Sequence, residues 1–112
     1  MVAKRKQTSS VPQHGEIWWA EAMDKRRPVL VVTRSVAIPV LSTIVIAPIT
    51  RTVRTVPTEI VLGPEQGLSE VCVASFDNVQ PIRKTLLTSR IGELSSCQVD
   101  EICRALSALA DC

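Results

Sequence analysis

The chain has 112 residues, of which 46% are hydrophobic and 21% are charged, a composition typical of one globular domain. No apolar run approaches the roughly 20 residues that a membrane-spanning helix needs. The formal net charge is +2, but three of the 13 basic residues lie at positions 4–6, so that 10 basic residues face 11 acidic ones elsewhere. This balance excludes binding of nucleic acid through bulk charge, and any such site must be a local cluster of cations.

Cysteine and histidine show no spacing typical of a metal site. The four cysteines form no Cys-x-x-Cys pair, and His14 is the only histidine, so we expect no metal and no cofactor. The basic N-terminus lacks the apolar segment of a secretory signal, which predicts a cytoplasmic protein with reduced thiols. Cys72 and Cys103 fall on apolar faces and are predicted to be small core residues.

Residues 1–12 are polar and basic, which predicts a disordered basic tail before a single domain over 13–112. The first strand is predicted over residues 15–22. It contains the adjacent Trp18 and Trp19, which must point to opposite faces. One ring can fill the core while the other packs on the second face, and base stacking is the alternative role.

The second predicted strand, residues 27–34, is the element around which the chain is organised. It opens with Arg27 and Pro28, and a proline at the start of a strand removes a donor that the ladder can spare. The four apolar residues that follow do not alternate with polar ones, which is typical of a strand buried on both faces. A loop then leads to a third strand over 42–49, which runs into Thr50.

Shorter elements follow these two strands. In chain order they are a turn or edge segment over 51–54, a strand over 57–62, a turn over 63–67, a strand over 70–75, an irregular stretch over 77–81 and one or two short strands within 82–94.

The last segment is predicted to be a helix. Ser95 can act as its N-cap and Gln98 can complete a capping box. Five to seven short strands before one helix predict a mainly β fold, a small and partly open β-barrel with a C-terminal α-helix. The apolar stripe of the helix is formed by Val99, Ile102, Cys103, Leu106 and Ala110.

Cations and a hydroxyl group gather at the ends of the two central strands. If these strands are antiparallel, the start of one lies beside the end of the other, so that Arg27 meets Thr50. Such a cluster can neutralise a phosphate backbone, and an ordinary solvated rim is the alternative interpretation. The other cations of this rim are Lys25, Arg26, Arg51 and Arg54.

Three segments, in order, resemble the MazF/PemK family of toxin endoribonucleases. They are residues 15–19, Gly-Glu-Ile-Trp-Trp, residues 27–32, Arg-Pro-Val-Leu-Val-Val, and residues 44–50, Ile-Val-Ile-Ala-Pro-Ile-Thr. The resemblance covers about residues 14–110 and is weaker after the third segment. It implies an SH3-like barrel with a helix, which forms a homodimer whose interface carries an RNA groove.

The resemblance also implies an activity and a site. Family members cut single-stranded RNA at short sequences without metal, by attack of the 2′-hydroxyl, and leave a cyclic phosphate; a cognate MazE-like antitoxin lays a peptide across the groove. The family's active-site arginine corresponds to Arg27 and its active-site threonine to Thr50. Asp77 and Asn78 match a polar pair that contacts bases or forms a turn. The cations expected to bind RNA are Lys25, Arg26, Arg51 and Arg54.

The resemblance does not supply a general base. Arginine stays protonated in proteins, and the Gly-Ser-Glu stretch that some family members carry in the first loop is missing from the short segment 23–26. Glu21 and Asp24 are the alternatives.

Two functions from other classes remain open. The same barrel resembles the CcdB-type inhibitors of DNA gyrase, which act through an apolar, tryptophan-bearing tail, but this chain ends with residues 108–112, Ala-Leu-Ala-Asp-Cys. The third interpretation is a barrel that binds RNA or protein without catalysis.

Overall fold

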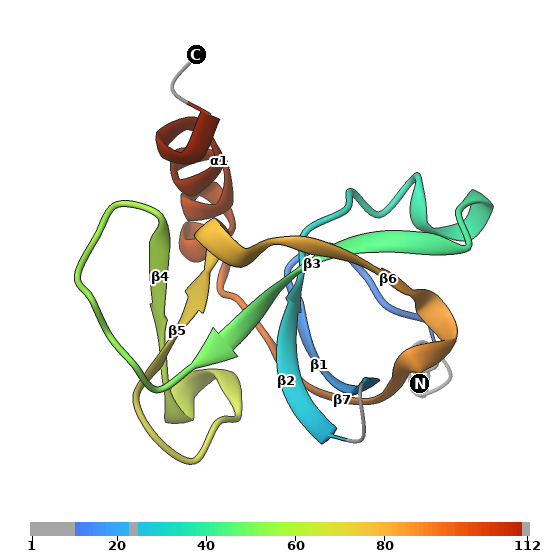
Figure 1. The fold of residues 1–112 in the computed structure, drawn as a ribbon, viewed down its shortest axis with the longest axis horizontal. Coiled ribbons are helices and arrows are strands. Elements are labelled where there is room, and N and C mark those ends of the chain that lie inside the picture. The colour runs from blue at the N-terminus through green and yellow to red at the C-terminus, as the bar shows by residue number, and fades with distance from the viewer. Residues whose placement is uncertain (1–10, 23–24, 111–112) are drawn as a thin grey trace.

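A computed structural model describes residues 11–22 and 25–110 (Figure 1). Ten residues of the expected basic tail lie outside this description, and Pro12 is buried. No helix within the described ranges is long and apolar enough to cross a membrane. The strands are β1 (Glu16–Ala22), β2 (Lys25–Val31), β3 (Thr43–Thr50), β4 (Glu59–Leu62), β5 (Cys72–Ser75), β6 (Gln80–Arg83) and β7 (Leu87–Glu93), and the helix α1 (Ser96–Ala110) follows.

The strands form one antiparallel sheet in the order β4-β5-β3-β2-β1-β7. β3 is the element that joins its two parts, because β6 pairs with the first half of β3 and β5 pairs with its end. The sheet curls around β3 into a partly closed barrel, and α1 lies beside β4 and β5 (Figure 1). The prediction of a mainly β, partly open barrel with a C-terminal helix is confirmed.

The second half of β2 is buried on both faces, as its unbroken apolar run predicts. Val29 and Val31 pack into one core cluster with Trp18. Leu30 points the opposite way, into a second cluster that includes Ile102 of α1. Because neighbouring side chains of a strand point to opposite faces, this one strand separates the two cores.

The two tryptophans lie on opposite faces of β1. Trp18 is buried, and its indole nitrogen donates a hydrogen bond of 2.9 Å to Glu16 Oε1, while Glu16 Oε2 accepts one of 2.9 Å from Arg90 of β7. Trp19 is half-buried on the other face, where the Arg26 guanidinium lies 4.5 Å from the ring centroid. Both rings therefore have packing partners within the chain.

The prediction that Pro28 lies at the start of the strand is wrong. β2 begins three residues before Pro28, and Pro28 pairs with Trp19 inside the strand. The last pair between β2 and β3 is Val29 with Pro48. Pro28 therefore has a strand neighbour on one side only, an edge position where a missing donor is tolerated. The stretch 77–81, expected to be irregular, contains the start of β6, whose pairing with β3 is a tertiary contact that local signals do not reveal.

The helix begins as predicted, and three residues of the expected stripe, Val99, Ile102 and Leu106, pack on the core. Ser95 Oγ accepts the Gln98 N–H at 3.2 Å, and Gln98 Oε1 accepts the Ser95 N–H at 3.0 Å, so the capping box is confirmed. Ile102 and Ala105 are buried against the sheet, whereas Cys103 is exposed. The prediction that Cys103 is a core residue is wrong, because it lies about 100° around the helix from Ile102.

The backbone of β7 passes very close to the turn that follows β4. A Cβ added to Gly92 would overlap the carbonyl oxygen of Gln66. We expect Gly92→Ala to lower the free energy of unfolding by about 1–3 kcal/mol, because the two segments must move apart. Urea denaturation measures this change. Gly63→Ala is the matched control, since the nearest atom to its Cβ is 3.9 Å away, and equal midpoints for the two variants would contradict the prediction.

Candidate active-site groove

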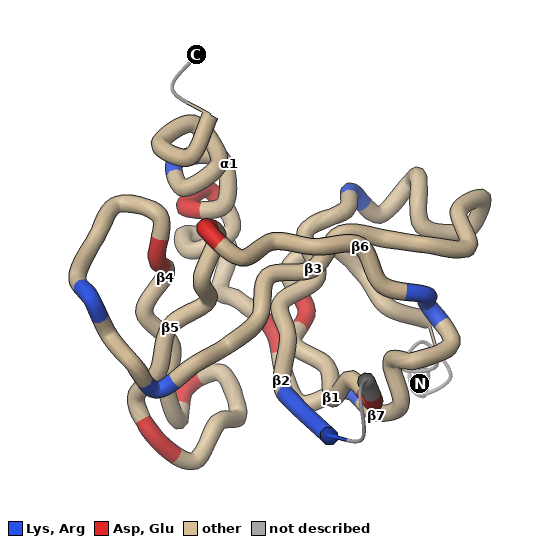
Figure 2. Tube along the Cα trace, in the orientation of Figure 1, with Lys and Arg blue, Asp and Glu red and all other residues tan. Residues whose placement is uncertain are grey.

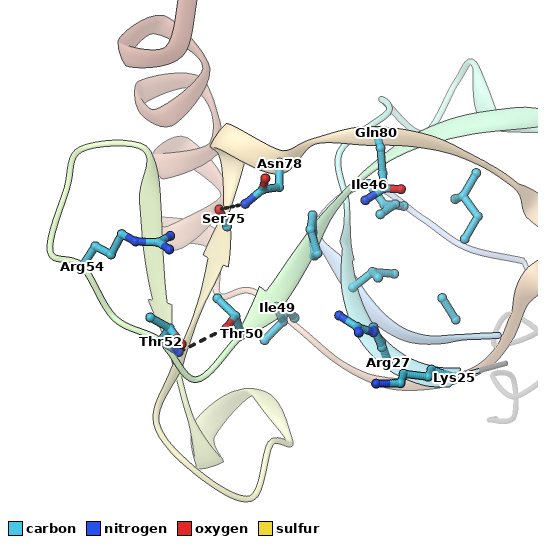
Figure 3. Close-up of a pocket in the computed structure, with 14 residues that line it drawn as sticks. Lys25, Arg27, Ile46, Ile49, Thr50, Thr52, Arg54, Ser75, Asn78 and Gln80 are labelled. Carbon is cyan, nitrogen blue, oxygen red and sulfur yellow. Dashed lines mark hydrogen bonds between the residues drawn. The ribbon is translucent and has the colours of Figure 1, made fainter. Parts of the chain in front are cut away.

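β2 and β3 separate where the sequence places Arg27 and Thr50. Beyond the pair of Val29 with Pro48, the end of β3 pairs with β5 instead, and Thr50 lies opposite Val73. Arg27 remains paired with β1 alone. The prediction that the two residues stand side by side on one rim is therefore wrong, because they occupy facing walls of a groove (Figure 3).

The groove between these walls has a volume of about 580 Å³. Its cations come from the start of β2 and from the loop after β3, both of which carry blue positions in Figure 2. Neutral polar groups come from β5, from the short turn after it and from β6 (Figure 3). The polar residues that line this Arg27–Thr50 groove are Lys25, Arg27, Thr50, Thr52, Arg54, Ser75, Asn78 and Gln80.

Five of the eight residues predicted for the site line the groove. The two predicted catalytic residues, Arg27 and Thr50, do so together with three of the predicted RNA-binding residues, Lys25, Arg54 and Asn78. Within the described ranges, neither Lys25 nor Arg27 takes part in an ion pair. Their charges are therefore available to an anionic ligand in the groove.

Arg26 lies on the other face of the β1–β2 hairpin. It pairs in register with Glu21, its Nε lies 3.4 Å from a Glu21 carboxylate oxygen, and its guanidinium covers Trp19. Adjacent residues of a strand point to opposite faces, so Arg26 cannot share the groove with Arg27. Side chains alternate between the two faces of a strand, so a strand predicted to start before Arg26 would have placed Arg26 and Arg27 on opposite faces.

Arg51 and Asp77 also point away from the groove. Arg51 Nη1 donates a hydrogen bond of 3.0 Å to Glu70, and Arg51 lines a neighbouring pocket of about 730 Å³ that shares Ile49 and Thr50 with the groove. Asp77 accepts a hydrogen bond of 2.7 Å from the Thr58 hydroxyl, which ties the turn after β5 to the start of β4. The turn-forming interpretation of Asp77 fits this contact, and the structure does not bring either residue to the groove.

The Thr50 hydroxyl is oriented by its own loop. Its oxygen accepts a hydrogen bond of 3.1 Å from the Thr52 N–H (Figure 3). Because the oxygen acts as an acceptor there, the hydroxyl can still donate its proton to a ligand in the groove. Thr50 can therefore stabilise negative charge that develops on a bound group.

Three groove residues were missed in the sequence. Thr52 lies two residues after Thr50, in a segment read only for its arginines. Ser75 accepts a hydrogen bond of 3.0 Å from Asn78 Nδ2. Gln80 is the first residue of β6, which pairs with β3. Only the spacing of Thr52 from Thr50 was a usable signal, because Ser75 and Gln80 reach the groove through strand pairing.

The two carboxylates considered as general base are in different situations. Glu21 is held by Arg26 on the face away from the groove. Asp24 lies outside the described residues. The titratable side chains that line the groove, among the residues described, are Lys25, Arg27 and Arg54.

The neighbouring pocket is also lined by the buried residue Cys72. Burial raises the pKa of its thiol, and the negative charge of Glu70 raises it further. The thiol therefore stays protonated at neutral pH, which is unfavourable for a nucleophile. Cys72 is a small core residue, as the sequence predicts.

Comparison with known proteins identifies the family and supports the fold. The family of PemK-like, MazF-like toxins of type II toxin–antitoxin systems matches residues 13–110. The chain belongs to this family. As a MazF-like toxin it shares 35% identity over 106 residues with the probable endoribonuclease MazF5 of Mycobacterium tuberculosis, a match that covers 93% of this chain and 97% of that protein.

Two further relatives support the same assignment. Endoribonuclease MazF3 of M. tuberculosis is 39% identical over 89 residues, which cover 80% of this chain and 86% of that protein. The solved structure of M. tuberculosis toxin MazF-mt6 superposes with a TM-score of 0.80 at 38% identity, over 86% of this chain and 96% of that one. These matches favour a MazF-like toxin over the gyrase-inhibitor interpretation.

Proposed function

We propose that this MazF-like toxin is an endoribonuclease that cuts single-stranded RNA in the Arg27–Thr50 groove without a metal. One observation carries the proposal. A guanidinium with no ion-pair partner among the described residues faces, across a groove, a threonine hydroxyl that accepts the Thr52 N–H and donates no hydrogen bond within the same part of the chain. Both groups are donors, and two further cations, Lys25 and Arg54, lie on the same two walls. This arrangement suits a phosphodiester that gains negative charge during reaction.

The reaction that these groups can support is an internal transfer. The 2′-hydroxyl of the substrate loses its proton and attacks the adjacent phosphorus, the bond to the 5′-oxygen breaks, and that oxygen takes up a proton. The products are a 2′,3′-cyclic phosphate and a 5′-hydroxyl end. Arg27 can hold the two non-bridging phosphoryl oxygens through its planar fork, and Thr50 can add a further donor to one of them. Each such preorganised donor can lower the barrier by about 3 kcal/mol.

The remaining groove residues divide into two roles. Lys25 and Arg54 bind phosphates that flank the cut and fix the path of the strand. Asn78 and Gln80 carry amides, which can both donate to and accept from the edges of bases. Asp24 is the remaining candidate for the general base, since Glu21 is paired on the other face.

The proposal includes three further properties that family membership supports. The toxin is restrained by a cognate MazE-like antitoxin, a peptide of which lies across the groove, where carboxylates can meet the cations. The toxin acts as a homodimer, and the groove lies at the dimer interface. Its location is the cytoplasm, where RNA and antitoxin are present.

The test is incubation of the purified protein with a long RNA in EDTA, followed by mapping of the ends. We expect cuts at one short sequence, with cyclic phosphate and 5′-hydroxyl ends, at the rate seen without EDTA. Arg27→Ala protein purified in parallel controls for contaminating ribonuclease. Loss of cleavage in EDTA, 3′-hydroxyl ends, or RNA binding without product would each contradict the proposal.

A further inference from the structure

A buried carboxylate outside the groove holds the loop that carries two of the groove residues. Glu59, the first residue of β4, is 6% exposed. Its Oε1 accepts the N–H of Arg54 at 3.1 Å and of Thr55 at 3.0 Å, and its Oε2 lies 3.3 Å from the Arg54 nitrogen. Two successive backbone N–H groups thus converge on one anion, a nest that binds negative charge.

The loop backbone is strained at this point. Thr55 has a φ of 58°, in the left-handed region that is unfavourable for a β-branched residue. Such a conformation costs free energy and persists only where surrounding contacts hold it. The Glu59 carboxylate supplies such contacts, because it accepts hydrogen bonds from the N–H groups of Arg54 and of Thr55.

Both ends of the loop are tied to neighbouring elements. At the β4 end, Arg104 of α1 donates to the Pro57 carbonyl at 2.6 Å and to the Glu59 carbonyl at 3.2 Å. At the β3 end, the Thr52 N–H donates to the Thr50 hydroxyl. The middle of the loop, which contains Arg54, is held by the Glu59 carboxylate, and the Arg54 side chain points from there into the groove (Figure 3).

We propose that Glu59 is a positioning residue for RNA cleavage, whose carboxylate fixes the loop over 51–58 so that Arg54 contacts a phosphate of the bound RNA. The inference rests on the proposed function of the groove. It assigns Glu59 no contact with RNA and attributes its effect on cleavage to the position of Arg54. A residue that only stabilised the fold would instead affect cleavage independently of Arg54.

A double-mutant cycle separates these two roles. Kinetics of cleavage of a short single-stranded RNA that contains the cut sequence are measured for Glu59→Gln, Arg54→Ala and the double variant. We expect Glu59→Gln to raise KM about tenfold with kcat within about twofold, the scale of one hydrogen bond to a charged group. In the Arg54→Ala background the same change should have no further effect.

Lys25→Ala provides the matched control cycle. Lys25 lines the same groove but is carried by β2, so the effects of Glu59→Gln and Lys25→Ala on KM should multiply. If the Glu59→Gln and Arg54→Ala effects also multiply, or if kcat falls while KM is unchanged, the proposal is overturned.

Two measurements keep the proposal testable if Glu59→Gln is unstable or if no RNA is cut. Arg104→Ala loosens the same loop from outside the buried site and should show the same lack of additivity with Arg54→Ala. Amide hydrogen exchange at Arg54 and Thr55 should accelerate in Glu59→Gln while Ala74 of β5 stays protected. Unchanged exchange would overturn the role of Glu59, whereas absence of cleavage by the parent protein would overturn the proposed function alone.

Discussion

Arg27→Ala is expected to lower kcat/KM for RNA cleavage by roughly 10²–10³-fold, the loss typical of removing one preorganised donor from a developing charge. The Arg27 side chain is exposed in the groove, and no ion pair among the described residues depends on it. The free energy of unfolding should therefore change by no more than about 0.5 kcal/mol. Single-turnover cleavage and urea denaturation of the same preparation measure the two effects.

Arg26→Ala is the control that the strand itself provides. It removes the adjacent cation, so the net charge changes by the same amount, but on the face that carries Trp19 and Glu21. Its cleavage rate should stay within about threefold of the parent, because an exposed charge at this distance is screened by salt. Equal losses for the two variants would mean that charge, and not the position of Arg27, supports the reaction.

Thr50→Val is expected to lower kcat roughly a hundredfold, because valine keeps the shape of threonine and removes the hydroxyl donor. Thr50→Ser should retain most of the activity, since it keeps the hydroxyl that accepts the Thr52 N–H. Because the donor acts on charge that develops during reaction, the effect should appear in kcat with little change in KM. Steady-state kinetics of the two variants on one RNA substrate provide the measurement.

The outcome that would contradict this role is specific. If Thr50→Val cuts RNA as fast as Thr50→Ser, the hydroxyl takes no part, and the groove depends on its cations alone. A uniform rise in KM in both variants would instead indicate that the end of β3 has moved. Hydrogen exchange at the Thr52 amide distinguishes a moved strand from a lost hydroxyl. Thr50→Val removes the acceptor of this amide and Thr50→Ser keeps it, so faster exchange in both variants would indicate that the strand has moved.

The sequence by itself determined the features that depend on neighbours along the chain. The unbroken run after Arg27 indicated a strand buried on both faces, and Ser95 with Gln98 indicated where the helix begins. The resemblance to the family selected Arg27 and Thr50. The predictions of the buried strand and of the helix start succeed because side-chain periodicity and capping chemistry are local properties of the chain.

Only the tertiary structure decided how the groove is assembled. β3 leaves β2 after Pro48 and pairs with β5, so Arg27 and Thr50 face each other across a groove instead of meeting on a rim. The pairing of β6 with β3 brings in Gln80, while Arg26 falls on the other face. Strand pairing joins residues that are far apart in the chain, and the parting of two strands depends on which neighbour each one finds; neither property is encoded by a local pattern.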